Sequence, residues 1–136
     1  MWVALVDGTI NDSLIIQTAQ GFLKNKEPLR LLYVIEVSRK FPVDKEIPEL
    51  TEIAEKYLDR LEQDGKFDVN ADIVQSRSVK SALITLSKED DVEGIILGEN
   101  ALSDVYPQEF SQIIRNVQCN IIFCNTYANN QRRIND

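Results

Sequence analysis

The pattern that most constrains this chain is an alternation of short strand-like runs with longer stretches of helical periodicity. The strand-like runs lie at residues 2–6, 29–37, 67–74, 94–97 and 121–124. Each is too short for a buried helix and is bounded by turn residues, which indicates strands. Strands that alternate with helices form a parallel sheet whose right-handed crossovers place helices on both faces. The sequence therefore predicts an α/β fold with five parallel strands.

Apolar residues at helical spacing fill the four segments between these runs. Asn11 or Asp12 is expected to cap the first helix, and Ser78 is expected to cap the third. The second helix is predicted over residues 49–64. Its apolar side consists of Leu50, Ile53, Ala54, Tyr57, Leu58 and Leu61.

Length and charge narrow the class of protein. The 136 residues predict one domain over residues 1–126 and a polar tail over residues 127–136. The net charge of -7 disfavours nucleic-acid binding, because such a chain repels phosphate backbones. No apolar run approaches the ~20 residues that a membrane span needs, so we expect no membrane insertion. Because no basic segment followed by an apolar stretch begins the chain, we expect a cytoplasmic protein.

The residue types exclude several kinds of catalytic site. The chain has no histidine, which removes Ser-His and Cys-His nucleophilic catalysis and histidine-based zinc sites. The two cysteines, Cys119 and Cys124, have neither CxxC nor metal-ligand spacing and are interpreted as core or near-core residues. No activated nucleophile or metal cluster emerges from the remaining residues, and we expect no enzymatic activity.

A ligand is expected at the carboxyl ends of the strands. In open parallel sheets the loops at these ends form the ligand crevice. The loop over residues 98–107 follows the fourth predicted strand, and it therefore lies where a small molecule would bind.

Four stretches of the chain resemble the universal stress protein family. They are WVALVDGT at 2–9, LRLLYVIEV at 29–37, ALITLSKEDDVEGIILG at 82–98 and IIRNVQCNIIFC at 113–124. The match covers about nine-tenths of the chain in order and spacing. The resemblance implies a Rossmann-like fold, similar to the adenine nucleotide alpha hydrolases, with five parallel strands in the order 3-2-1-4-5.

Nucleotide-binding members of that family carry Gly-x2-Gly-x9-Gly followed by Ser or Thr, whose bare amides hold phosphate. Here Gly98 matches the first glycine, and Ala101 stands at the second. The third position falls on Ser111 if no gap is allowed. It falls on Pro107, followed by Gln108, if the alignment runs backward from the cysteine before the last strand, which is the placement we prefer. Either way the third glycine is absent, and we predict that tight ATP binding is lost.

The residues retained from the family pattern outline a candidate adenosine crevice. They are Asp7, Val34, Leu97, Gly98, Asn100 and Gln108. Other interpretations remain open: Asp7 as a turn residue, Val34 as a core residue and Gly98 as a simple strand-to-loop turn. No resident cofactor is expected, although weak binding of AMP, or of ATP with Mg²⁺, stays open. Convergence of the carboxylates of Glu36, Glu99 and Asp104 above the sheet is a further alternative, because paired carboxylates can hold a metal or perform acid-base chemistry.

The last predicted strand lies at an edge of the sheet in the family order. It contains neither proline nor lysine, the residues that disfavour pairing with the edge strand of another molecule. Family members often dimerise through this strand, and we expect a homodimer through Ile121 and Phe123. The sequence thus predicts a cytoplasmic, dimeric binding or regulatory module in stress response. The alternatives are an ATP- or AMP-binding universal stress protein with at most slow hydrolysis, and a regulatory domain that partners a membrane transporter.

Overall fold

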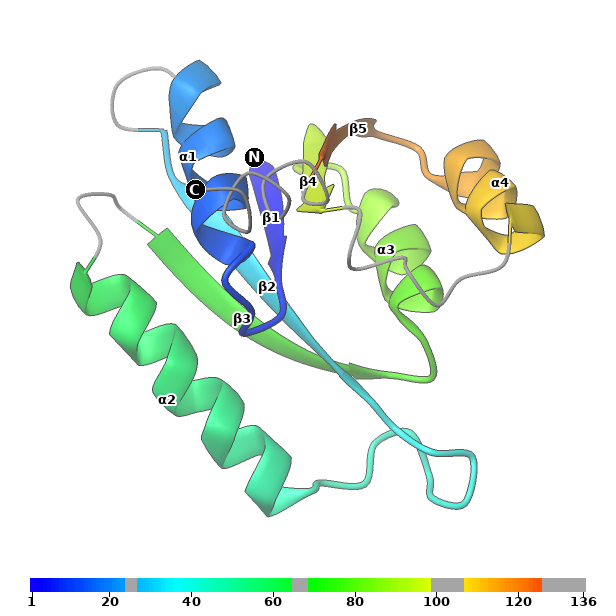
Figure 1. The fold of residues 1–136 in the computed structure, drawn as a ribbon. Helices are drawn as coiled ribbons and strands as arrows, with labels where there is room; N and C mark the ends of the chain where they lie inside the picture. The colour runs from blue at the N-terminus through cyan, green and yellow to red at the C-terminus, as the bar shows by residue number, and fades with distance from the viewer. Residues whose placement is uncertain (24–26, 65–68, 99–106, 126–136) are drawn as a thin grey trace, which may run out of the picture.

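The computed structural model describes residues 1–23, 27–64, 69–98 and 107–125. Five parallel strands form one sheet in the order β3-β2-β1-β4-β5 (Figure 1). They are β1 (Trp2–Val6), β2 (Leu29–Glu36), β3 (Val69–Ser76), β4 (Gly94–Gly98) and β5 (Asn120–Cys124). The predicted sheet is confirmed in strand number, direction and order.

In the described residues four helices lie between consecutive strands. They are α1 (Asp12–Phe22), α2 (Pro48–Asp64), α3 (Val79–Ser87) and α4 (Pro107–Asn116). The predicted cap of α3 is confirmed, because the Ser78 hydroxyl accepts a hydrogen bond from the Ser81 amide at 3.1 Å.

Each face of the sheet has its own apolar core. On one face α1 and α2 contribute Ile15, Ala19 and Leu58, which pack with Ala4, Val6 and Ile96. On the other face α3 and α4 contribute Leu83, Leu86 and Ile113, which pack with Val3, Leu5 and Ile95. The central strand β1 is covered on both sides, which explains its continuous apolar sequence (Figure 1).

Several predicted boundaries and faces differ from the structure. β2 ends at Glu36 rather than at residue 37, β3 continues to Ser76, and residues 67–68 lie outside the described residues. Leu50 and Ile53, predicted for the buried side of α2, are exposed at 43% and 60%. Ile53 lies about 100° around the helix from the fully buried Ala54. Leu50 shares the face of Ala54, so its exposure shows that the sheet no longer covers the first turn.

Candidate functional site

The strand register brings three of the predicted site residues to one edge of the sheet. β1 pairs with β4 so that Ala4 lies beside Ile96, and the same register continued by two residues places Gly98 level with Val6. Val6 pairs with Tyr33 on the other side, which places Val34 level with Asp7. The chain reverses strand order between β1 and β4, and such switch points are where open α/β sheets bind ligands.

The side chains of the predicted site residues differ in their surroundings, and some lie outside the described residues. The side chain of Leu97 is buried in the core beneath α3 and α4, beside Phe123 of β5. Val34 packs against the same core and is half-buried. Gln108 lies in the first turn of α4, while its side chain is outside the described residues. Asn100, Glu99 and Asp104 also lie outside the described part, as does the tail over residues 127–136.

Asp7 organises the turn that follows β1. One oxygen of its carboxylate accepts hydrogen bonds from the Thr9 amide at 3.0 Å and from the Thr9 hydroxyl at 2.6 Å. Gly8 has a φ of +83°, a conformation that favours glycine. This geometry is that of an aspartate-stabilised turn, which was one of the two interpretations of Asp7, and the side chain is exposed at the edge of the sheet.

Asp12 has a role that the sequence did not predict. Its side chain is buried, with 2% exposure, and points back to the turn instead of capping α1. The Asp7 amide donates to its two oxygens at 3.1 and 3.3 Å, and the Gly8 amide donates at 2.9 Å. Asn11 occupies the cap position and makes no side-chain capping bond. The predicted cap position is therefore confirmed at Asn11, but neither side chain makes a capping hydrogen bond, because the Asp12 carboxylate accepts from the amides after β1 instead.

A tyrosine from a distant helix completes this arrangement. The Tyr57 hydroxyl on α2 donates a hydrogen bond to Asp12, and the Tyr57 ring packs edge-on against Tyr33 with centroids 6.3 Å apart. The contact ties the β1–α1 turn to α2. We call the group formed by Asp7, Gly8, Asn11, Asp12 and Tyr57 the carboxyl-edge site.

Burial dominates the electrostatics of this site. Burial, with a smaller contribution from the charge of Asp7, raises the pKa of Asp12 to about 6, although the hydrogen bonds from Tyr57 and from the Asp7 and Gly8 amides lower it. Burial, followed by the hydrogen bond to Asp12, raises the pKa of Tyr57. The pKa of Tyr33 is raised by burial and by the charges of Asp7 and Asp12. The site is therefore acidic and rich in hydrogen-bond acceptors.

These charges oppose an anionic ligand. In dinucleotide-binding Rossmann folds a glycine-rich turn after the first strand holds a phosphate, whereas the resemblance to universal stress proteins places the phosphate at the loop after β4. Here the Asp12 carboxylate already accepts hydrogen bonds from the amides of Asp7 and Gly8. A phosphate charge ~4 Å from a carboxylate is repelled by roughly 4 kcal/mol at an effective dielectric of 20. The arrangement thus favours neutral or donor-bearing ligands over phosphates.

Exposed apolar side chains surround the same edge. Five of the seven exposed large apolar side chains among the described residues lie in the β1–α1 turn, the β2–α2 link and the start of α2. They are Ile10, Phe41, Val43, Leu50 and Ile53. Two side chains hold the β2–α2 link by hydrogen bonds. Gln75 donates to the carbonyl of Val43 at 3.0 Å, and Arg77 donates to the carbonyl of Ser38 at 2.7 Å.

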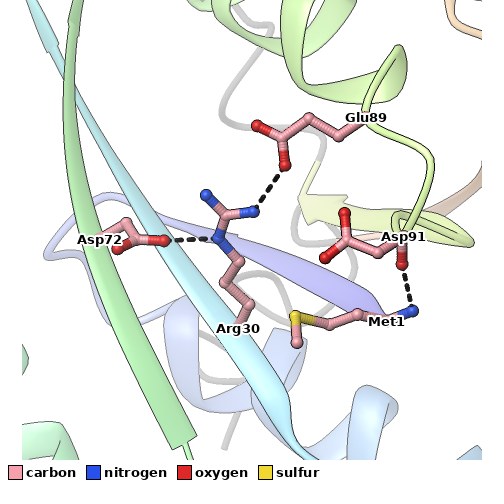
Figure 2. A network of polar contacts seen from close by, with 5 residues as sticks. All are labelled: Met1, Arg30, Asp72, Glu89 and Asp91. Atoms are coloured by element: carbon pink, nitrogen blue, oxygen red, sulfur yellow. Dashed lines mark hydrogen bonds and ion pairs between the residues drawn. The ribbon is translucent and has the colours of Figure 1, made fainter.

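The opposite edge of the sheet carries an ion-pair network. Figure 2 shows the Arg30 guanidinium between two carboxylates, with Asp72 Oδ2 2.5 Å from Nε and Glu89 Oε2 2.9 Å from Nη1. Burial by itself lowers the pKa of Arg30, but the bonds to Glu89 and Asp72 outweigh it and raise the pKa. A hollow of about 530 Å³ adjoins the network, with Arg30, Asp72 and Asp91 in its lining. Nε and Nη1 of Arg30 each have an acidic partner, which indicates a structural role.

Strand β5 lies at the edge of the sheet. Phe123 is 39% exposed, whereas Ile121 on the same side is half-buried against the core. Cys119 and Cys124 are free thiols, and burial raises the pKa of Cys119. Within the described ranges no group of three or more acidic, cysteine or histidine side chains is arranged to hold a metal ion. No helix there is long and apolar enough to cross a membrane.

Comparison with known proteins identifies the fold. No protein-family model and no curated protein sequence matches the chain. A universal stress protein family member from Burkholderia pseudomallei superposes with a TM-score of 0.57 at 14% identity, over 90% of this chain and 94% of its own. Universal stress protein UspA from Lactobacillus plantarum gives 0.61 at 16% identity, over 92% of this chain and 97% of its own.

A third solved structure, a hypothetical protein studied as a test case of structural genomics, gives a TM-score of 0.61 at 18% identity. The match covers 90% of this chain and 93% of that one. Identities this low establish the fold alone. The chain has the Rossmann-like α/β fold of universal stress proteins, with the five-stranded parallel sheet that the resemblance implied.

Proposed function

We propose that this chain is a cytoplasmic protein of the universal stress type that acts in a stress response as a dimeric binding or regulatory module without tight ATP binding. The observation that carries the proposal is the position of the Asp12 carboxylate on the amides of Asp7 and Gly8. A buried carboxylate that already accepts the hydrogen bonds of these amides leaves them unavailable to a phosphate and repels a triphosphate at this edge of the sheet.

The sequence of the phosphate loop supports the same conclusion. Only Gly98 remains of the three glycines of the family motif, because Ala101 replaces the second and Pro107 or Ser111 the third. An alanine in a positive-φ position costs on the order of 1 kcal/mol, and proline removes an amide donor. Two separate features thus weaken phosphate binding, one on each side of the switch point.

A role as a binding module is supported by the apolar surface at the carboxyl edge. The side chains of Ile10 in the β1–α1 turn and of Leu50 and Ile53 near the start of α2 are exposed. A dimer is supported by the edge position of β5 and the 39% exposure of Phe123. The fold shared with universal stress proteins supports the stress-response assignment.

An ATP- or AMP-binding protein with at most slow hydrolysis is the second candidate. It is favoured by the alignment of Asp7, Val34 and Gly98 at the switch point, where the resemblance implies adenosine contacts. Such a protein would need Mg²⁺ or another cation to offset the repulsion between the phosphates and the carboxylates of Asp7 and Asp12.

Two experiments separate these candidates. The protein is purified without added nucleotide and its bound small molecules are identified by native mass spectrometry, and its thermal unfolding is followed during titration with Mg-ATP. The proposal predicts no co-purified ATP and a negligible rise in Tm at sub-millimolar Mg-ATP. Stoichiometric ATP, or a rise of several degrees, would favour the nucleotide-binding candidate.

Asp12→Ala provides the matched variant. It removes the buried carboxylate and leaves the amides of Asp7 and Gly8 without this acceptor. If Asp12 excludes phosphate, Asp12→Ala responds more strongly to Mg-ATP than the wild type does. An equal response in the two proteins would show that Asp12 does not set the preference.

A further inference from the structure

Asp7 and Gly8 form an Asp-Gly pair in an exposed turn. Both residues are exposed, and they lie between the end of β1 and the start of α1, outside any helix or strand. Glycine has no Cβ, so the nitrogen that follows an aspartate is least shielded from that aspartate's own carboxyl group when the next residue is glycine. A Cβ added to Gly8 would meet its nearest atom, Tyr33 Oη, only at 3.8 Å, so the turn is open around this nitrogen.

An Asp-Gly pair can rearrange without any other reactant than water. The Gly8 nitrogen attacks Cγ of the protonated Asp7 carboxyl group, an N–Cγ bond forms, and one carboxyl oxygen leaves as water with the amide hydrogen. The product is a five-membered succinimide ring. Solvent water then opens the ring. Cleavage of the bond from nitrogen to Cγ restores aspartate, whereas cleavage of the bond from nitrogen to the backbone carbonyl carbon gives isoaspartate.

The Asp12 carboxylate opposes closure of this ring. The Gly8 amide donates a hydrogen bond to Asp12 Oδ2 at 2.9 Å, and the side chain of Asp12 is only 2% exposed. The nitrogen of a succinimide carries no hydrogen, so ring closure must break this bond and leave a buried acceptor without its donor. The loss of a hydrogen bond to a charged group slows a reaction about tenfold or more.

Thr9 restrains the other reacting group. Its amide and its hydroxyl donate to one oxygen of the Asp7 carboxylate at 3.0 and 2.6 Å. These bonds fix the carboxylate in the orientation of the turn, and the ring closes only when Cγ moves from that position onto the Gly8 nitrogen. Both partners of the reaction are therefore held in the folded protein, the nitrogen by Asp12 and the carboxylate by Thr9.

We propose that Asp7–Gly8 is a site of aspartate isomerisation, and that the Asp12 carboxylate suppresses this reaction in the folded protein by holding the Gly8 amide. No ligand takes part in the reaction, so this role of Asp12 goes beyond the proposed function. The hydrogen bond that makes the Gly8 amide unavailable to a phosphate also protects the turn from covalent change.

The test follows isomerisation in the whole chain. The wild type, Asp12→Ala, Asp12→Asn and Arg30→Met are incubated at neutral pH over several weeks, and the wild type is also incubated in guanidinium chloride. Trypsin then releases residues 1–24 as one peptide, and it releases a second Asp-Gly pair, at 64–65, in a peptide of residues 61–66. Aspartate and isoaspartate forms of a peptide separate by chromatography, and electron-transfer fragmentation assigns the isomer to its residue.

The variants separate a local effect of Asp12 from a general loss of stability. Arg30→Met is the matched control, because it removes ion pairs at the opposite edge of the sheet and leaves the bond between Gly8 and Asp12 in place. Asp12→Asn keeps the shape of the side chain and offers a neutral oxygen, which is a weaker acceptor. The pair at residues 64–65 serves as the internal reference in every sample.

The folded wild type is expected to isomerise at Asp7 about tenfold more slowly than the denatured chain. Asp12→Ala should raise the rate in the folded protein about tenfold and Asp12→Asn about threefold, whereas Arg30→Met should leave it within about twofold of the wild type. The rate at residues 64–65 should be the same in the wild type and the Asp12 variants.

Three results would overturn the proposal. Rates at Asp7 that are equal in the wild type and Asp12→Ala, or in the wild type and Asp12→Asn if the alanine variant fails to fold, would show that Asp12 does not suppress the reaction. Equal acceleration by Arg30→Met would show that general unfolding sets the rate. Isoaspartate that forms in the denatured chain at residue 64 and not at residue 7 would show that Asp7–Gly8 is not a site of isomerisation.

Discussion

The indole ring of Trp2 lies so close to Gly94 that no side chain fits between them. These two residues pair across β1 and β4 in the centre of the sheet. A Cβ atom placed on Gly94 would lie 2.2 Å from Cζ3 and 2.4 Å from Cη2 of Trp2. The fourth strand begins with glycine because the first begins with tryptophan.

Gly94→Ala should therefore destabilise the protein by roughly 1–3 kcal/mol, since the indole is held between two strands and must move. Gly21→Ala is the matched control, because a Cβ on Gly21 meets nothing within 4 Å and the residue lies in α1. That change should stabilise the protein by about 0.5–1 kcal/mol. Urea unfolding measures both, and equal effects of the two substitutions would contradict the close packing.

The buried carboxylate of Asp12 should make stability depend on pH. Its folded-state pKa, about 6, lies above the ordinary value of 3.8, so the folded state binds the proton more tightly. The stabilisation is complete below pH ~4 and is lost as pH rises through about 6, with a total on the order of 3 kcal/mol. Subtracting the unfolding free energies of Asp12→Asn from those of the wild type between pH 4 and 7.5 isolates this contribution.

Tyr57→Phe refines the same experiment. The hydrogen bond from Tyr57 lowers the pKa of Asp12, so its removal should move the pH window upward. Parallel stability curves for the wild type and Asp12→Asn over the whole range would contradict a raised pKa for Asp12.

Arg30→Met should lower stability by about 1–2 kcal/mol. The guanidinium is one-fifth exposed and links β2 to Asp72 of β3 and to Glu89 after α3, so its loss leaves two carboxylates without their partner (Figure 2). Lys56→Met removes the exposed pair with Glu52 four residues earlier and should cost only a few tenths of a kcal/mol. If both substitutions have the same effect in denaturant unfolding, the network at the amino edge adds nothing beyond a surface ion pair.

Phe123→Lys tests the proposed dimer. A charge on the exposed side of β5 should prevent the pairing of two edge strands, and light scattering should then report the mass of a monomer. Ile53→Lys is the control, because Ile53 is 60% exposed on α2 rather than on β5. A wild-type monomer, or a Phe123→Lys protein that keeps the mass of a dimer, would rule out this interface.

The fold was predictable because its signals are local. Strand-length apolar runs, the turn at Gly8 and the cap at Ser78 lie within a few residues of the structure that each one specifies. The exposure of Leu50 was not predictable, because helical phase gives the face of a helix and not where the sheet beneath it ends.

The carboxyl-edge site was only partly predictable for a related reason. Asp7 and Gly98 follow or end strands that the sequence pattern locates well, and the resemblance to universal stress proteins marked them as candidate site residues. The bond between Tyr57 and Asp12 joins residues 45 positions apart, and no local pattern specifies it. A signal for Asp12 did exist, since an aspartate just after a glycine turn often binds the turn amides.

The backbone amides of Asp7 and Gly8 provide the most direct test of the central claim, which is that the Asp12 carboxylate holds these two amides and disfavours a phosphate at this edge of the sheet. Their resonances in a ¹⁵N–¹H NMR spectrum report whatever accepts their hydrogen bonds. We predict that both shift with pH through about 6, as Asp12 titrates, and stay unchanged when Mg-ATP is added to about 1 mM. Saturable shifts of these two amides with Mg-ATP, unchanged by protonation of Asp12, would contradict the account.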